Sequence, residues 1–165
     1  MTKQEQQDDD RPYLIDDPRV LTLMTSMSPH MNQLGISIES ITPGECIFKQ
    51  PYQEAFIGNP DTGVVHGGLI TTLMDSACGL TVFSMMKDMV AIATLDLRID
   101  YLRPAKPGLP IYGKGICYKR TADVAFVRGV AYDESEDDPI ANTVGVFALT
   151  PGNNDIFKKF LSTHK

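Results

Sequence analysis

The stretch from Gly68 to Met86 limits the possible folds more than any other part of the sequence. Its residues are apolar almost all round a helical wheel, and Asp75 is the single charge within it. A helix of this kind is stable only where other elements cover it on every side. A membrane span is disfavoured, because the stretch falls short of about 20 clean apolar residues. We therefore expect a buried helix with a sheet wrapped around it.

Strand patterns lie on both sides of that helix. Residues 35–42 and 45–51 are rich in β-forming residues and flank the turn dipeptide Pro43-Gly44, which predicts a hairpin. After the helix, four further runs of strand length predict antiparallel strands, at residues 91–101, 111–120, 124–132 and 140–149. In the first of these runs, Ala93, Leu95, Leu97, Ile99 and Tyr101 alternate with Thr94, Asp96, Arg98 and Asp100. Strict alternation predicts that the two sets face opposite sides of the sheet.

A further helix is predicted near the amino terminus. Asp16-Asp17-Pro18 has the acidic cap and early proline of a helix start, and the apolar residues that follow predict a helix to about Asn32. Residues 53–65 are interpreted as a loop. The predicted fold class is α+β, with an antiparallel β-sheet wrapped around a long central α-helix.

Length and charge favour one globular domain that does not bind nucleic acid. The 165 residues are long enough for one substantial core, and we predict a mobile tail over residues 1–15 and a single domain over residues 16–165. The net charge is −6, and no basic stripe is present to follow a phosphate backbone. Three widely spaced cysteines and a polar amino terminus without an apolar run favour a reducing compartment, the cytoplasm.

The segment His66-Gly67-Gly68 stands where the long helix begins. The first N–H groups of a helix have no partner inside the helix, and the dipole makes this end partly positive. The Gly67 N–H is therefore a candidate oxyanion donor, with Gly68 giving a substrate close access to the backbone. The alternative is that the two glycines merely allow a tight entry from loop to helix.

Asp75 is the second candidate for chemistry. An ionised carboxylate among apolar neighbours is costly unless it is hydrogen-bonded or functional. It is a candidate nucleophile or general base, and the alternative is a structural aspartate bonded to a threonine or to backbone. Eight residues separate it from Gly67, which corresponds to about 12 Å along a helix. Since that distance is too long for one carbonyl, we predict a two-fold homodimer in which each site takes Asp75 from one chain and Gly67 from the other.

Several of these motifs together resemble one known family. Asn59, His66-Gly67-Gly68, Asp75 and the later Tyr101-Leu102-Arg103-Pro104-Ala105 are similar to the signature of hotdog-fold thioesterases. The resemblance is to the PaaI-like group of phenylacetate degradation and a related human group, and it covers residues 35–150. It implies the hotdog fold, an acyl-CoA thioesterase activity and a homodimer or a homotetramer built as a dimer of dimers.

The resemblance also implies roles for residues outside the helix. Thr94 matches a serine or threonine that holds the attacking water near the catalytic acid, and Asn59 matches an amide that contacts the thioester carbonyl or positions water. Turn formation is the alternative for Asn59, and a surface position on a strand is the alternative for Thr94. His66 is more suited to orienting the loop than to proton transfer.

Substrate contacts are predicted from charge and from shape. Four basic residues are candidates for the phosphates of coenzyme A, with solvated surface charge as the alternative: Arg103, Lys106, Lys119 and Arg120. A set of apolar residues is the candidate lining of an acyl or aryl pocket, with ordinary core as the alternative: Leu73, Met74, Val82, Phe83, Met85, Met86 and Met89.

The predicted function is hydrolysis of a short-chain, medium-chain or aryl acyl-CoA to free acid and coenzyme A. No cofactor is required beyond the coenzyme A of the substrate, no metal is predicted because no ligand cluster has the necessary spacing, and no membrane partner is expected. Two alternatives stay open: a hotdog dehydratase acting on 3-hydroxyacyl thioesters, and a non-catalytic acyl-CoA-binding domain.

Overall fold

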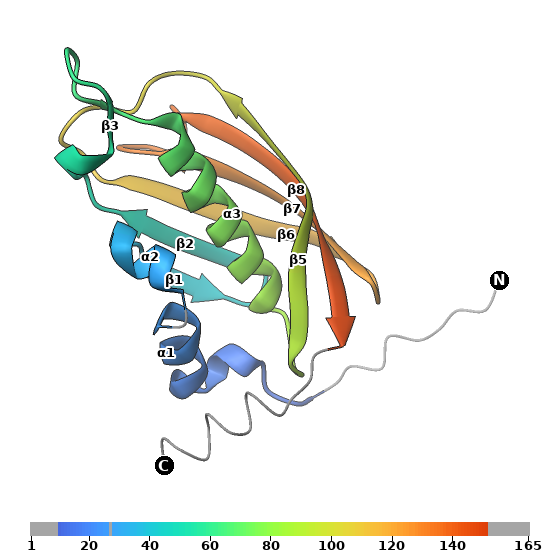
Figure 1. Ribbon diagram of the computed structural model, residues 1–165. Coiled ribbons are helices and arrows are strands. Elements are labelled where there is room, and N and C mark those ends of the chain that lie inside the picture. Colours follow the sequence, from blue (N-terminus) through green and yellow to red (C-terminus); the bar gives the residue numbers. More distant parts are fainter. Residues whose placement is uncertain (1–9, 27, 152–165) are drawn as a thin grey trace.

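The long helix lies across one face of a six-stranded antiparallel sheet (Figure 1). The computed structural model describes residues 10–26 and 28–151. The helix α3 spans Gly67–Phe83, and the sheet has the order β1-β2-β6-β7-β8-β5. The strands are β1 (Ser37–Thr42), β2 (Glu45–Gln50), β5 (Val90–Tyr101), β6 (Ile111–Arg120), β7 (Val124–Tyr132) and β8 (Ala141–Pro151). The predicted architecture of a sheet around one helix is therefore correct.

Close packing of α3 on the sheet depends on small residues in the strands. Leu73, Met74 and Cys78 of α3 are fully buried. A β-carbon added at Gly113 would lie 2.9 Å from Leu73 Cγ, and one at Gly115 would lie 2.5 Å from Thr81 Oγ1. Neither distance is compatible with a real side chain, so these glycines let the helix approach the strands directly.

One side of α3 is not covered within one chain. Gly68 and Thr71 are exposed there, and Thr72 and Asp75 are partly exposed. The sheet thus wraps around the helix as predicted but leaves one stripe of it open within a single chain. Small and polar residues at these positions make one open stripe tolerable in an otherwise apolar helix.

The predicted helix over residues 16–32 is divided in two. A short 3-10 turn, η1 (Leu14–Asp16), precedes α1 (Pro18–Ser26) and α2 (Pro29–Leu34). Pro29 lacks the N–H needed to continue a helix, and Ser28 caps α2 by accepting a hydrogen bond from the Met31 N–H. The break turns α2 toward the sheet edge formed by β1 and β2 (Figure 1).

The alternation predicted for β5 is interrupted. Thr94 pairs with Phe147 and Asp96 pairs with Val146, so Leu95 is an extra residue that forms a β-bulge. The bulge shifts the pleat by one residue. Thr94 and Tyr101 therefore both face α3, although strict alternation placed them on opposite sides, and Leu95 is 62% exposed.

The predicted loop over residues 53–65 contains short elements of its own. A 3-10 turn, η2 (Glu54–Phe56), leads into a small hairpin of β3 (Ile57–Asn59) and β4 (Val64–Val65). At its base a β-carbon on Gly58 would lie 2.8 Å from the His66 Cα. The hairpin is thereby fixed directly beside the amino end of α3.

The segment before α1 packs against the residues that follow α3. Leu14 donates its N–H to the Met86 carbonyl and Ile15 is buried, so the packed part of the chain extends into the segment predicted as a tail. Residues 1–9 of that tail lie outside the described residues.

Cys46, Cys78 and Cys117 are all free thiols. Within the described ranges, the helices are too short or too polar to cross a membrane.

Candidate active site

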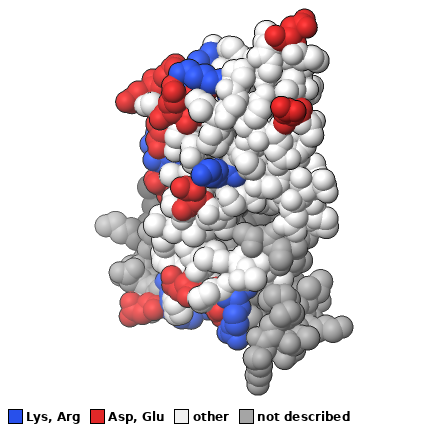
Figure 2. All heavy atoms as spheres, turned by 90° about the vertical axis from the view of Figure 1, so that its left-hand side faces the viewer, with Lys and Arg blue, Asp and Glu red and all other residues white. Residues whose placement is uncertain are grey.

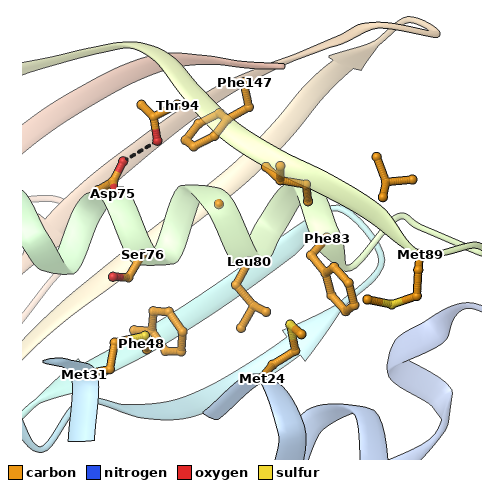
Figure 3. Close-up of a pocket in the computed structure, with 13 residues that line it drawn as sticks. Met24, Met31, Phe48, Asp75, Ser76, Leu80, Phe83, Met89, Thr94 and Phe147 are labelled. Carbon is orange, nitrogen blue, oxygen red and sulfur yellow. Dashed lines mark hydrogen bonds between the residues drawn. The ribbon is translucent and has the colours of Figure 1, made fainter. Parts of the chain in front are cut away.

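Asp75 lies at one end of an apolar cavity of about 370 Å³ (Figure 3). The Thr94 hydroxyl donates a hydrogen bond of 2.8 Å to Asp75 Oδ1. The cavity continues between α3, β5 and the two amino-terminal helices, and its other lining residues are Met24, Met31, Phe48, Ser76, Gly79, Leu80, Phe83, Met89, Val90, Ile92 and Phe147. A carboxylate held by a hydroxyl therefore faces an apolar space.

This cavity differs from the pocket lining predicted from the sequence. Of the predicted residues, Phe83 and Met89 line it. Leu73, Met74 and Val82 are fully buried core residues instead. The methionines that line the cavity besides Met89 are Met24 of α1 and Met31 of α2. Sequence reasoning missed these two because their contribution depends on how α1 and α2 pack.

The first turn of α3 leaves one backbone N–H available. His66 is the N-cap, and its Nδ1 accepts the Gly68 N–H at 2.9 Å. The His66 carbonyl accepts the Leu69 N–H. Within the described part of the chain no acceptor is found for the Gly67 N–H. Gly67 is thus the first-turn residue that retains a donor for a ligand, while the Gly68 N–H is already used.

Tyr101 fixes the same turn from the sheet. Its hydroxyl donates to the Gly67 carbonyl at 2.7 Å and lies 2.9 Å from Thr71 Oγ1. A β-carbon at Gly67 would be 3.4 Å from that hydroxyl, an ordinary van der Waals contact, so the tyrosine ring packs directly against this turn. Tyr101 had no predicted role of its own. The bulge at Leu95 brings it to this position, and a bulge leaves no clear signal in the sequence.

A second cavity, of about 350 Å³, borders Gly67. It is lined mainly by apolar residues of β4, α3 and the segment after β5, namely Val64, Val65, Ile70, Tyr101, Leu102, Arg103, Pro104 and Ala105. Gly67 and Asp75 therefore border different cavities of one chain. Their separation, about 12 Å along the axis, agrees with this division.

Asn59 takes part in the β3–β4 turn. Its Oδ1 accepts the Asp61 N–H at 3.0 Å, and its carbonyl accepts N–H groups from Thr62 and Gly63. The turn-forming alternative considered for Asn59 is thus realised by its carbonyl oxygens. The side-chain amide remains exposed near the amino end of α3, and a substrate contact through it stays a prediction.

Two of the four basic residues are held in ion pairs. Arg103 makes a two-pronged pair with Asp133, at 2.9 and 2.7 Å, and its Nε lies 3.0 Å from Asp138 Oδ2. Hydrogen bonding to the guanidinium holds the pKa of Asp133 far below its usual value and raises the pKa of Arg103. Lys106 pairs with Glu134. To bind a phosphate of coenzyme A, Arg103 and Lys106 would have to leave these ion pairs or contact the phosphate and the carboxylate together.

The other two basic residues lie at the far end of α3. Arg120 donates to the Met85 carbonyl at 3.2 Å, just beyond the carboxyl end of the helix, and Lys119 is exposed beside it. Within one chain the structure does not bring them near Gly67. Their contact with coenzyme A stays a prediction.

Comparison with known proteins identifies the family. Residues 62–140, which include His66, Asp75 and Thr94, match the model of the thioesterase superfamily. A protein of Halobacterium salinarum with a provisional esterase assignment is 37% identical over 116 residues, which cover 68% of this chain and 77% of that protein. The chain belongs to the thioesterase superfamily.

Solved structures agree with this assignment. A crystal structure of a Pseudomonas aeruginosa protein is 43% identical, with a TM-score of 0.72 over 79% of this chain and 96% of that one. The PaaI protein of the E. coli phenylacetic acid degradation operon has a TM-score of 0.70 at 18% identity, over 80% and 91% of the two chains, and this likeness concerns the fold alone. The hotdog fold and the assignment as a thioester hydrolase are confirmed, and the PaaI protein shares that fold.

The described residues of this thioesterase contain no group of histidine, cysteine and acidic side chains that could hold a metal ion. Cys78 lies one turn from Asp75, but burial raises the pKa of its thiol to about 12, so it remains protonated at neutral pH and is a poor nucleophile. Among the side chains around the first cavity, Asp75 is therefore the strongest candidate for attack.

Proposed function

We propose that this thioesterase hydrolyses short-chain, medium-chain or aryl acyl-CoA to the free acid and coenzyme A. The observation that carries the proposal is the Asp75 carboxylate, held by Thr94 at one end of an apolar cavity. An acyl group would lie in the cavity with its thioester carbonyl beside the carboxylate. No metal or cofactor is proposed, and coenzyme A takes part only as a portion of the substrate.

In the proposed reaction, Asp75 either attacks the thioester carbonyl itself or removes a proton from a water that attacks it. The carbon–sulfur bond then breaks and the thiolate of coenzyme A leaves. In the first case, water hydrolyses the resulting anhydride. The negative charge on the carbonyl oxygen would be stabilised by the Gly67 N–H at the positive end of α3.

We further propose that the Gly67 N–H comes from a second copy of the chain. The two groups lie about two turns apart on one helix and border different cavities. Figure 2 shows that most charged side chains gather along one side of the visible face, while the opposite side carries a few acidic groups among uncharged residues. A face with few charges, together with the open stripe on α3, suits an interface between two copies. A homodimer, alone or as half of a tetramer, is the proposed assembly.

The first experiment measures release of free thiol from a panel of acyl-CoA and aryl-CoA thioesters. Asp75→Asn should lower kcat by about 100-fold or more, because it removes the nucleophile or base. Asp96→Asn is the matched control, since Asp96 is an exposed acid on the same strand as Thr94. If no thioester is hydrolysed, or if Asp75→Asn retains full turnover, the proposed function is wrong. Thiol release also separates hydrolysis from dehydration and from binding without reaction.

The second experiment tests whether the site is shared between chains. Gly67→Pro removes the N–H, and proline is tolerated at the first helical position after an extended residue such as His66, whose φ and ψ are −64° and 134°. Asp75→Asn alone and Gly67→Pro alone should each be inactive. Co-expressed Asp75→Asn and Gly67→Pro chains form mixed dimers with one intact site, so about a quarter of wild-type activity should return. Absence of any recovery from folded mixed dimers would place both groups in one chain's site.

A further inference from the structure

Gly79 lies inside α3, where a glycine is unfavourable compared with alanine. Many glycines near the core of this protein are required by close packing. A β-carbon at Gly129 would lie 2.5 Å from the Lys114 carbonyl oxygen, and one at Gly145 would lie 3.1 Å from Leu97. At Gly79 the nearest atom would be Phe147 Cε1 at 3.7 Å, an ordinary contact. Neither packing nor backbone conformation requires glycine at position 79.

The position of Gly79 on the cavity wall explains why this residue is a glycine. Asp75, Gly79 and Phe83 are spaced four residues apart, so they lie on one face of α3 and all line the same cavity. The cavity thus runs for about 12 Å from Asp75 to Phe83, with Gly79 about 6 Å along. Any longer side chain at position 79 would project into this path.

The chemistry of the lining fits an acyl chain rather than coenzyme A. The polar side chains around the cavity are Asp75, Ser76 and Thr94, and no described lining residue is Lys or Arg. Figure 3 shows Asp75 and Thr94 toward one end and Phe83 and Met89 toward the other. A phosphate would find no cation here, whereas a hydrocarbon chain would find an apolar surface that flexible methionines adjust to.

We propose that this cavity binds the straight acyl chain of a medium-chain acyl-CoA, and that Gly79 is the residue that sets the accepted chain length. The proposal rests on the function proposed above and narrows its substrate class. An extended chain with bonds of about 1.5 Å advances about 1.3 Å per carbon, so about ten carbons span the distance from Asp75 to Phe83. An aryl group such as phenylacetyl is shorter and leaves the end near Phe83 empty.

The test compares kcat/KM for butanoyl-, octanoyl-, decanoyl-, hexadecanoyl- and phenylacetyl-CoA. In the wild type, kcat/KM should rise by about fourfold or less for each added methylene up to decanoyl, and by at least about 100-fold in total. Hexadecanoyl-CoA should give no further gain. Gly79→Leu should lower the decanoyl-to-butanoyl ratio by at least about 30-fold, because leucine blocks the cavity halfway. Ala91→Leu, which adds the same side chain at an exposed position on β5 outside the cavity, should keep the wild-type ratio.

Gly79→Ala is a second variant that tests the same assignment if Gly79→Leu does not fold. An alanine methyl has room at this position, so this variant should melt at a higher temperature than the wild type and still lower the decanoyl-to-butanoyl ratio, by about two- to fivefold. An unchanged ratio in a folded Gly79 variant overturns the assignment of Gly79. Equal rates for butanoyl and decanoyl thioesters, or a best rate with phenylacetyl- or hexadecanoyl-CoA, overturn the assignment of the chain length.

A binding measurement separates failure of this inference from failure of the proposed function. Calorimetric titration of Asp75→Asn with decanoyl-CoA and butanoyl-CoA should give tighter binding of decanoyl-CoA, and the added Gly79→Leu substitution should remove the difference. If the wild type hydrolyses thioesters without a preference for chain length, the function stands and the inference fails. If nothing is hydrolysed but the binding difference is found and depends on Gly79, the function fails and the cavity assignment stands.

Discussion

At the scale of single residues, Asp75 depends on the hydroxyl of Thr94. Thr94 donates to Asp75 Oδ1 from the edge strand β5, whereas the residues next to Asp75 on the helix are largely apolar. A hydrogen bond to a charged group is worth about 1.5–3 kcal/mol. The hydroxyl therefore fixes which carboxylate oxygen faces the cavity, which makes Thr94 a positioning residue.

We expect Thr94→Val to lower kcat by about 10- to 100-fold with a smaller change in KM, because the carboxylate loses its orienting donor while the shape of the side chain is kept. Thr94→Ser retains a hydroxyl and should restore kcat to within about threefold of wild type. Steady-state thiol release measures both parameters. Equal losses in the valine and serine variants would show that the hydroxyl is not the relevant group.

A second residue-scale feature is the ion pair between Arg103 and Asp133. The Asp133 side chain is fully buried and that of Arg103 is 20% exposed. Asp133→Asn should lower the free energy of unfolding at pH 7 by about 2–4 kcal/mol, because it leaves a largely buried guanidinium without its counter-charge. Glu134→Gln, at an exposed neighbouring acid, should change stability much less.

The same pair predicts a dependence on pH. The pKa of Asp133 is lower in the folded chain than the value of about 3.9 expected when unfolded. Its contribution is therefore complete above about pH 4 and is lost as the pH falls toward the folded pKa. Urea unfolding at pH 7 and pH 3 should show a smaller difference between wild type and Asp133→Asn at pH 3. A constant difference would contradict this explanation.

At the scale of elements, the bulge in β5 decides which side chains meet α3. One extra residue, Leu95, lets Thr94 and Tyr101 contact the helix although their spacing in a regular strand would place them on opposite faces. Deleting Leu95 should therefore lower activity at least as far as Thr94→Val, because one of the two contacts must turn away. Leu95→Thr keeps the bulge and should retain far more activity. Thiol release and thermal melting of both variants test this, and an active, stable deletion variant would contradict it.

At the scale of the whole molecule, one chain leaves an open stripe on α3 and places Asp75 and Gly67 at different cavities. Gly68 and Thr71 are exposed on that stripe and Thr72 and Asp75 are partly exposed, although ten residues of α3 are buried. A second copy would cover the stripe and complete both sites at once. We expect sedimentation at micromolar concentration to give a dimer or a tetramer, with activity in that species. A monomer that is fully active would contradict the shared site.

The sequence by itself determined the α+β layout of a sheet around one helix, because the apolar helix and the strand runs are local patterns. It also pointed to Gly67 and Asp75 as a pair too far apart for one carbonyl, since helix geometry fixes that distance. Tertiary structure decided the rest. The bulge at Leu95 brings Thr94 to Asp75. Acidic residues between positions 133 and 138 form ion pairs with Arg103 and Lys106. The packing of α1 and α2 places Met24 and Met31 in the lining of the cavity. Those outcomes depend on contacts between residues distant in the sequence, which no local pattern specifies.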